Sequence, residues 1–88
     1  RLYQEVCIIA ERADIHEEII RLDSHVKYFE KTMDESGEIG RKLDFITQEM
    51  NREINTINSK SLDDSIIKEG IEIKSRIEKL KEQVQNIE

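Results

Sequence analysis

Hydrophobic residues recur along the chain in three stripes that have the spacing of amphipathic helices. Apolar residues of the first stripe alternate steps of four and three: Ile15, Ile19, Leu22, Val26, Phe29 and Met33. The second stripe comprises Ile39, Leu43, Ile46, Met50, Ile54 and Ile57, and the third comprises Ile66, Ile73, Ile77, Leu80, Val84 and Ile87. Such spacing is typical of heptad-type helices that pack side by side. We expect a first helix over about residues 2–33 and a second that ends near residues 58–60.

Breaks between the stripes are short and carry turn signals. Residues 33–38 interrupt the pattern, and Gly37 there can adopt a positive φ. Ser61 followed by Asp64 predicts the N-cap of the third helix. Gly70 takes the missing position of the third stripe, which would permit close approach of a neighbouring backbone. Because short loops favour antiparallel neighbours, we predict an all-α fold, either an antiparallel helical hairpin or a three-helix bundle with long heptad-type helices.

Composition supports long helices and narrows the class of protein. Charged residues make up 39% of the 88 residues and hydrophobic ones 36%, with no proline and only three glycines. The single cysteine, Cys7, lies in an apolar turn, where we expect a buried small hydrophobe in a protein of a reducing compartment. The net charge of −6 argues against a general nucleic-acid-binding module but allows a local basic patch. The chain opens with Arg1 and an apolar turn without a helix-start signal, so we expect it to be part of a longer protein.

Acidic residues and one histidine flank the first two stripes. Glu18 and His25 fall along one edge of the first stripe, and Glu49 and Glu53 flank the second. If these edges face each other, the four side chains converge between the helices, where carboxylates and an imidazole would suit Mg²⁺, Mn²⁺ or Zn²⁺. A metal bound there would activate water for phosphodiester cleavage. Spacing alone instead favours solvated flanking pairs, because no short metal-ligand motif is present.

The polar face of the second helix is unusual for a helix that only has to be soluble. This face carries Gln48, Asn51, Arg52, Asn55 and Ser59. Asn and Ser compete with the helical backbone for hydrogen bonds, so they are costly in a helix. Arg52 and Lys60 could contact phosphates while the amides read sugars or base edges. The alternative is a polar interface with a neighbouring domain, and the residues by themselves favour neither.

Longer segments of the chain match a known pattern. Glu11–His25 resembles the pattern Glu-Arg-x-Asp-x-x-Glu-Glu-x-x-Arg-Leu-x-Ser-His of the bacterial YicC/YloC family. Gly40–Phe45 and Gln48–Glu53 are similar to the second signature of that family, which Asn55-Thr56 and Ser59-Lys60 continue. The ending, residues 81–88, is similar to the usual C-terminus of the family. Together these matches cover nearly the whole chain.

The resemblance implies that residues 1–88 form the C-terminal helical domain of a longer, cytoplasmic bacterial endoribonuclease. Its N-terminal α+β domain is absent from this chain, and the intact protein would act as a ring-like hexamer with Mn²⁺ or Mg²⁺. The expected partners are RNA, the N-terminal domain of the same protein and other copies of it, with no membrane. We expect the domain by itself to be inactive. The competing hypothesis is a structural module for oligomerisation or interdomain contact, with catalysis carried elsewhere.

Candidate roles follow from combining the resemblance with the two edges. The candidate catalytic residues, which are also the candidate metal ligands, are Glu18, His25, Glu49 and Glu53. The candidate RNA-binding residues are Arg21, Asn51, Arg52, Asn55 and Lys60.

Overall fold

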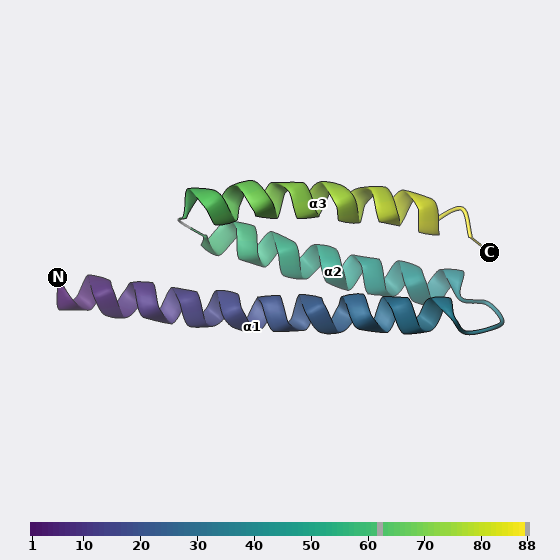
Figure 1. The fold of residues 1–88 in the computed structure, drawn as a ribbon, viewed down its shortest axis with the longest axis horizontal. Coiled ribbons are helices and arrows are strands. Elements are labelled where there is room, and N and C mark those ends of the chain that lie inside the picture. The colour runs from purple at the N-terminus through teal and green to yellow at the C-terminus, as the bar shows by residue number, and fades with distance from the viewer. Residues whose placement is uncertain (62, 88) are drawn as a thin grey trace.

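The structure, a computed structural model, describes residues 1–61 and 63–87. Three helices follow one another along the chain: α1 (Leu2–Met33), α2 (Gly40–Lys60) and α3 (Asp64–Val84). Each runs antiparallel to the one before it (Figure 1). The predicted all-α fold and the long first helix are therefore confirmed.

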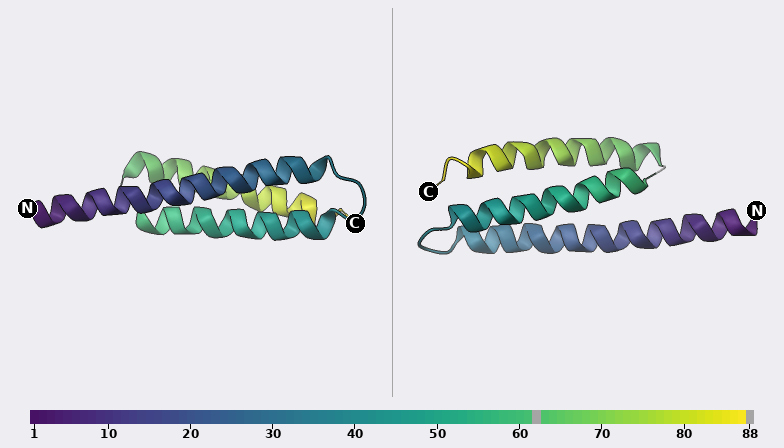
Figure 2. Two further views of the ribbon diagram at one scale, coloured as in Figure 1. Left: turned by 90° about the horizontal axis from the view of Figure 1, so that it is seen from below. Right: turned by 180° about the vertical axis from the view of Figure 1, so that it is seen from behind.

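The middle helix holds the fold together. α2 packs against α1 on one side and against α3 on the other, whereas the α1 and α3 backbones do not contact each other over the described residues. The result is an elongated, twisted layer of 56 × 19 × 14 Å with α2 at its centre (Figures 1 and 2). Because the layer is not closed into a compact bundle, the grooves between its helices stay open to solvent.

The core is mainly aliphatic, and α2 supplies most of it. Nine apolar residues are buried: Ile15, Phe29, Leu43, Ile46, Met50, Ile54, Ile57, Ile77 and Val84. The predicted stripe of α2 is buried from Leu43 to Ile57. On α3 the stripe is buried at Ile77 and Val84, whereas Ile73 is 39% exposed. Burial of apolar area at about 25 cal/mol per Å² therefore holds α1 and α3 to the same central helix.

The contacting face of α1 differs from the predicted stripe. Ile15, Leu22 and Phe29 face α2 as expected, but the other stripe members are exposed: Ile19, Val26 and Met33. Polar residues one position earlier take their places in the interface: Glu18, His25 and Thr32. Apolar residues are spread around most of the circumference of α1, so hydrophobicity orients this helix only weakly. Contacts with α2 therefore decide which face turns inward.

The ends of the helices confirm the role predicted for Gly37 and correct the role predicted for Ser61. Gly37, in the turn after α1, has a φ of 95°, which is the left-handed conformation expected of it. Ser61 is not the N-cap of α3: it ends α2, and its hydroxyl donates to the Ile57 carbonyl at 2.8 Å. Asp63 is the N-cap instead, and its side chain accepts from the Ser65 backbone N–H at 2.9 Å. Ser61 therefore serves the preceding helix, because its hydroxyl is already bonded to a carbonyl of the last turn of α2.

The first turns of α1 project beyond the end of α2 (Figure 1). Residues 1–10 are all exposed, including Cys7, which was expected to be a buried hydrophobe. An apolar turn is buried only where another element covers it, and the described part of the chain supplies none here. No helix among the described residues is long and apolar enough to cross a membrane.

Gly70 allows a close approach, but of a side chain and not of a backbone. The Asn58 carboxamide of α2 lies against the backbone of α3 and donates to the Gly70 carbonyl at 3.4 Å. A Cβ atom at Gly70 would overlap with the Asn58 side-chain oxygen. The gap in the third stripe is therefore filled by a polar side chain from α2.

We predict that Gly70→Ala destabilises the domain by about 1 kcal/mol, because displacing Asn58 breaks a part-buried hydrogen bond and leaves its polar groups unpaired at a cost of about 2 kcal/mol, against a gain of about 1 kcal/mol in helix propensity. The free energy of unfolding is measured by urea denaturation followed by circular dichroism. The double variant Gly70→Ala/Asn58→Ala should be more stable than Gly70→Ala, since the overlap is gone. A Gly70→Ala protein more stable than the wild type would contradict this account.

Candidate functional site

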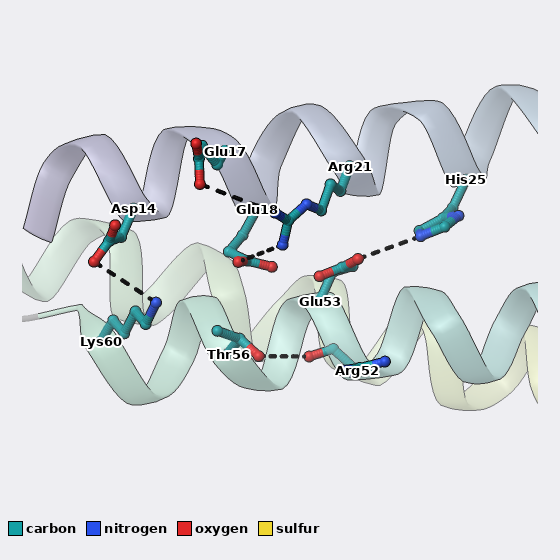
Figure 3. A network of polar contacts seen from close by, with 9 residues as sticks. All are labelled: Asp14, Glu17, Glu18, Arg21, His25, Arg52, Glu53, Thr56 and Lys60. Carbon is teal, nitrogen blue, oxygen red and sulfur yellow. Dashed lines mark hydrogen bonds and ion pairs between the residues drawn. The ribbon is translucent and has the colours of Figure 1, made fainter.

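An open groove of about 580 Å³ runs between α1 and α2. Its walls come from two turns of each helix, and the nine lining residues are Glu18, Ile20, Arg21, Ser24, His25, Glu49, Arg52, Glu53 and Thr56. The predicted edges of the two helices thus face each other, and all four candidate catalytic residues line one groove. Figure 3 shows the polar contacts along it.

A pair of buried carboxylates lies in the wall of the groove. Glu18 projects from α1 and Glu53 from α2, and only 7% and 8% of each residue is exposed. Their carboxyl groups lie next to each other across the interface (Figure 3). Two carboxylates this close and largely out of water repel each other when both are ionised. The pair therefore favours a state in which one of the two carboxyls keeps its proton.

The surroundings of Glu18 and Glu53 shift the pKa values of the two carboxyls in opposite directions. Burial raises the pKa of Glu53, and the neighbouring Glu18 carboxylate raises it further, against the lowering effect of His25. Hydrogen bonding from Glu53 lowers the pKa of Glu18, and Arg21 and Lys60 add to this effect against the burial of the group. Of the two carboxyls, Glu53 therefore holds its proton to the higher pH, while Glu18 ionises first.

Basic side chains bracket the pair on both sides (Figure 3). Arg21 donates from Nη1 to Glu18 Oε1 at 3.0 Å, one turn along α1. His25 Nε2 lies 3.3 Å from Glu53 Oε2 across the interface. Lys60 Nζ lies 3.8 Å from Asp14 Oδ2 and so ties the end of α2 to α1. Acidic and basic side chains from both helices thus follow one another along the groove and the helix edge beside it.

Glu49 and Arg52 line the groove but take no part in the ion pairs described above. Glu49 is half-buried, Arg52 is exposed, and neither side chain makes a hydrogen bond or ion pair with any residue in the described ranges. Thr56 donates its hydroxyl to the Arg52 carbonyl at 3.0 Å, so it is occupied by its own helix. The carboxylate of Glu49 and the guanidinium of Arg52 therefore remain available to a bound molecule.

The asparagines expected beside Arg52 lie on the other side of α2. Asn55 accepts a hydrogen bond from Lys74 of α3. Asn51 is half-buried, and its Oδ1 atom is buried without a hydrogen-bond partner within residues 1–61 and 63–87. The polar face predicted for the second helix thus divides into an α1 side, which lines the groove, and an α3 side. An RNA-binding role for Asn51 and Asn55 stays a prediction.

The four candidate ligands do not assemble into a closed metal site. Among the residues that the structure describes, no three His, Cys, Asp or Glu side chains stand close enough together to hold one ion. Within this groove, His25 Nε2 is engaged by Glu53, and Glu18 by Arg21. The side chains as arranged therefore do not fit a metal held by this domain alone, and metal binding stays a prediction.

Ser24 and Ile20 line the groove but were not singled out from the sequence, whereas Thr56 lies on the edge of the second stripe that the sequence predicts. Ser24 lies one position before His25 and three after Arg21, so the helical spacing that selected those two residues would also have placed Ser24 nearby. Its hydroxyl adds a neutral hydrogen-bonding group between charged neighbours.

Comparison with known proteins covers the entire chain. The family described as "Endoribonuclease YicC-like, C-terminal" matches residues 1–88. Over 88 residues the chain is 52% identical to a protein of Clostridioides difficile named probable endoribonuclease YicC. The matched segment covers 100% of this chain and 30% of that protein. A protein of Haemophilus influenzae with the same name is 46% identical over 88 residues, covering 100% of this chain and 31% of that protein. The chain thus spans less than a third of the length of these relatives.

The opposite pKa shifts predict that the pair stabilises the fold most near pH 4.5, the ordinary pKa of both groups. Above that pH the unfolded chain releases the Glu53 proton before the folded chain does, so the free energy of unfolding falls as the pH rises toward the raised pKa. Below it the unfolded chain protonates Glu18 first, so the free energy of unfolding falls again.

Glu53→Gln should abolish the decline above pH 4.5, because the amide is uncharged and still donates to Glu18. Urea denaturation from pH 4.5 to neutral measures this effect. Glu49→Gln is the matched control: it makes the same charge change in the same groove and should retain the decline. Identical pH profiles for the wild type and both variants would refute the raised pKa of Glu53.

Proposed function

Because the chain belongs to the endoribonuclease YicC-like C-terminal family, we propose that it is the C-terminal helical domain of an endoribonuclease that hydrolyses phosphodiester bonds in single-stranded or structured RNA. We place part of the cleavage chemistry in the groove between α1 and α2. The observation that carries this proposal is the Glu18–Glu53 pair, whose pKa values are pushed apart. The chain spans less than a third of its relatives, so the rest of the protein would complete the site.

Cleavage of a phosphodiester needs one group that accepts a proton and one that donates a proton. A base removes the proton of the attacking oxygen, a bond forms from this oxygen to phosphorus, and an acid protonates the oxygen that leaves. Two carboxylates with separated pKa values are suited to these two tasks. In our proposal the ionised Glu18 is the base and the protonated Glu53 is the acid, with His25 positioning the Glu53 carboxyl.

Positive side chains in the groove would hold the phosphate. Arg52 is exposed and unpaired among the described residues, so its guanidinium is the strongest candidate for a bidentate contact with phosphate oxygens. Arg21 already neutralises Glu18 and lies 4.0 Å from Glu17. A phosphate in the groove would draw Arg21 away from Glu17, which is largely exposed, at little cost. Lys60 would extend this line of charge toward Asp14.

Mn²⁺ or Mg²⁺ remains the proposed cofactor of the intact protein. Mg²⁺ is commonly bound by one or two carboxylates together with substrate phosphates and water. Glu49 is the groove carboxylate without a partner among the described residues, so it is the side chain best placed to contribute. None of the proton transfers above depends on the ion.

The apolar surface of α1 favours a second role in assembly. Five apolar residues of its first turns are 47–78% exposed: Leu2, Tyr3, Val6, Ile8 and Ile9. Contiguous exposed apolar residues mark surfaces that contact another protein element. We propose that this surface contacts the N-terminal domain or another copy of the protein, consistent with a hexamer. The two roles use different parts of the domain and are compatible.

To test the catalytic proposal, Glu53→Gln is introduced into the intact protein and RNA cleavage is measured with Mn²⁺ present. We expect kcat to fall about 10²- to 10⁴-fold, the usual contribution of a general acid. The molecular mass of the assembly should not change. Glu17→Gln, an exposed neighbour on the same helix, is the matched control and should cleave normally. Wild-type cleavage by both Glu53→Gln and Glu18→Gln would show that catalysis lies elsewhere.

To test the assembly role, Val6→Asp and Ile9→Asp are introduced into the intact protein. A carboxylate in a buried apolar contact is strongly unfavourable, so we expect smaller assemblies by light scattering. Ile71→Asp, at a residue of α3 that is 62% exposed, is the control and should leave the mass unchanged. Unchanged mass in all three variants would exclude the first turns of α1 from the interface.

A further inference from the structure

Two aromatic side chains are exposed beyond one end of the groove. Tyr28 of α1 is 42% exposed and Phe45 of α2 is 61% exposed. Phe29, next to Tyr28 in the sequence, is the aromatic residue that the core uses. Phe45 belongs to the segment Gly40–Phe45, which resembles a family signature, yet it contributes nothing to the buried core. The Phe45 ring is therefore accessible to a bound molecule.

Helical spacing places both rings at the same end of the groove. Tyr28 lies four residues after Ser24, and Phe45 lies four residues before Glu49, so each residue lies about 6 Å, roughly one helical turn, beyond a groove residue along its helix. Because α1 and α2 are antiparallel, the direction from Ser24 to Tyr28 along α1 is also the direction from Glu49 to Phe45 along α2 (Figure 1). A contact confirms the alignment: the Lys42 ammonium of α2 lies 5.4 Å from the centre of the Tyr28 ring.

The surroundings of each ring are polar. On the surface of α2, the residues three and four positions from Phe45 are Arg41, Lys42, Gln48 and Glu49. On α1, the corresponding neighbours of Tyr28 are Ser24, His25, Lys31 and Thr32. A protein-docking patch is a contiguous apolar surface, as the first turns of α1 are. Single rings set among cations and hydroxyls instead match the way single-stranded nucleic acid is bound, with bases stacked on aromatic faces and phosphates on basic groups.

The Tyr28 ring is also held in place before any ligand arrives. Lys42 contacts the ring and donates to Glu35 Oε1 at 3.1 Å, so the ammonium is fixed between the turn after α1 and the ring. A pre-positioned ring loses little conformational entropy when a base stacks on it.

We propose that Tyr28 and Phe45 form a stacking site for an unpaired nucleobase of an RNA strand whose phosphates lie in the groove beside Arg21 and Arg52. This inference rests on the proposed function, because it assigns the base next to the phosphodiester that the groove would cleave. It narrows the substrate to RNA that is unpaired at this position: single strands, loops and bulges.

The test uses the intact protein and a fluorescently labelled single-stranded RNA, together with a series in which one abasic site is moved along the strand. Binding is measured by fluorescence anisotropy, and intact RNA is verified on a denaturing gel. For the wild type we expect an abasic site at one subsite to weaken binding about 5- to 100-fold, the usual worth of a base stacked on an aromatic residue.

Phe45→Ala should weaken binding of the complete RNA to a similar extent and erase the dependence on the abasic position. Tyr28→Ala should act in the same way, whereas Tyr28→Phe keeps the ring and should bind like the wild type. Ile71→Ala is the matched control, because Ile71 is as exposed as Phe45 but lies on α3. Circular dichroism verifies the fold of each variant.

The outcomes separate this inference from the proposed function. An abasic effect of equal size in wild type, Phe45→Ala and Tyr28→Ala would overturn the stacking site. A change in assembly mass with the abasic effect retained would also overturn it, because the rings would then be protein contacts. Position-dependent stacking in a protein that cleaves none of the RNAs would instead refute the catalytic role and leave the stacking site standing.

Discussion

Glu18 of α1 and Glu53 of α2 meet inside the interface between the two helices, where neither residue is more than 8% exposed. Double ionisation of the pair is disfavoured, because two negative charges held close together and out of water repel each other. Arg21 contacts Glu18 and His25 contacts Glu53, so the contacts that orient α1 on α2 also set the charges around the pair. In the proposed function, the proton held by Glu53 is the one that would serve chemistry in the groove.

α2 carries a different polar surface toward each neighbour, which explains its unusual composition. Toward α1 it presents the groove residues around Glu53, and toward α3 it presents asparagines that bond Lys74 and the Gly70 carbonyl. Between these two sides runs the apolar stripe from Leu43 to Ile57. Asn, Ser and Thr weaken a helix on their own account, but here tertiary contacts on both sides offset that cost. A central helix can accept such residues because it is the one helix packed on two flanks.

The exposed surface divides in a similar way. Apolar residues cluster in the first turns of α1, which project past α2, and that surface suits contact with another protein element. The groove and its flanking rings, Tyr28 and Phe45, are instead set among polar and charged groups. Assembly and RNA handling would therefore be separable by mutation within a single small domain.

The sequence by itself determined the helices, their approximate ends and their antiparallel order, because the stripes of α2 and α3 are strongly one-sided and the intervening loops are short. It also placed Glu18, His25, Glu49 and Glu53 on edges that meet. It did not determine the inward face of α1, since Ile15, Leu22 and Phe29 fit two registers and apolar residues surround that helix. Tertiary contacts selected the register that buries Glu18 and His25 and exposes Ile19 and Val26. Only the tertiary structure could decide this, because the partners that stabilise a buried carboxylate lie on another helix, at a separation in sequence that no local pattern encodes.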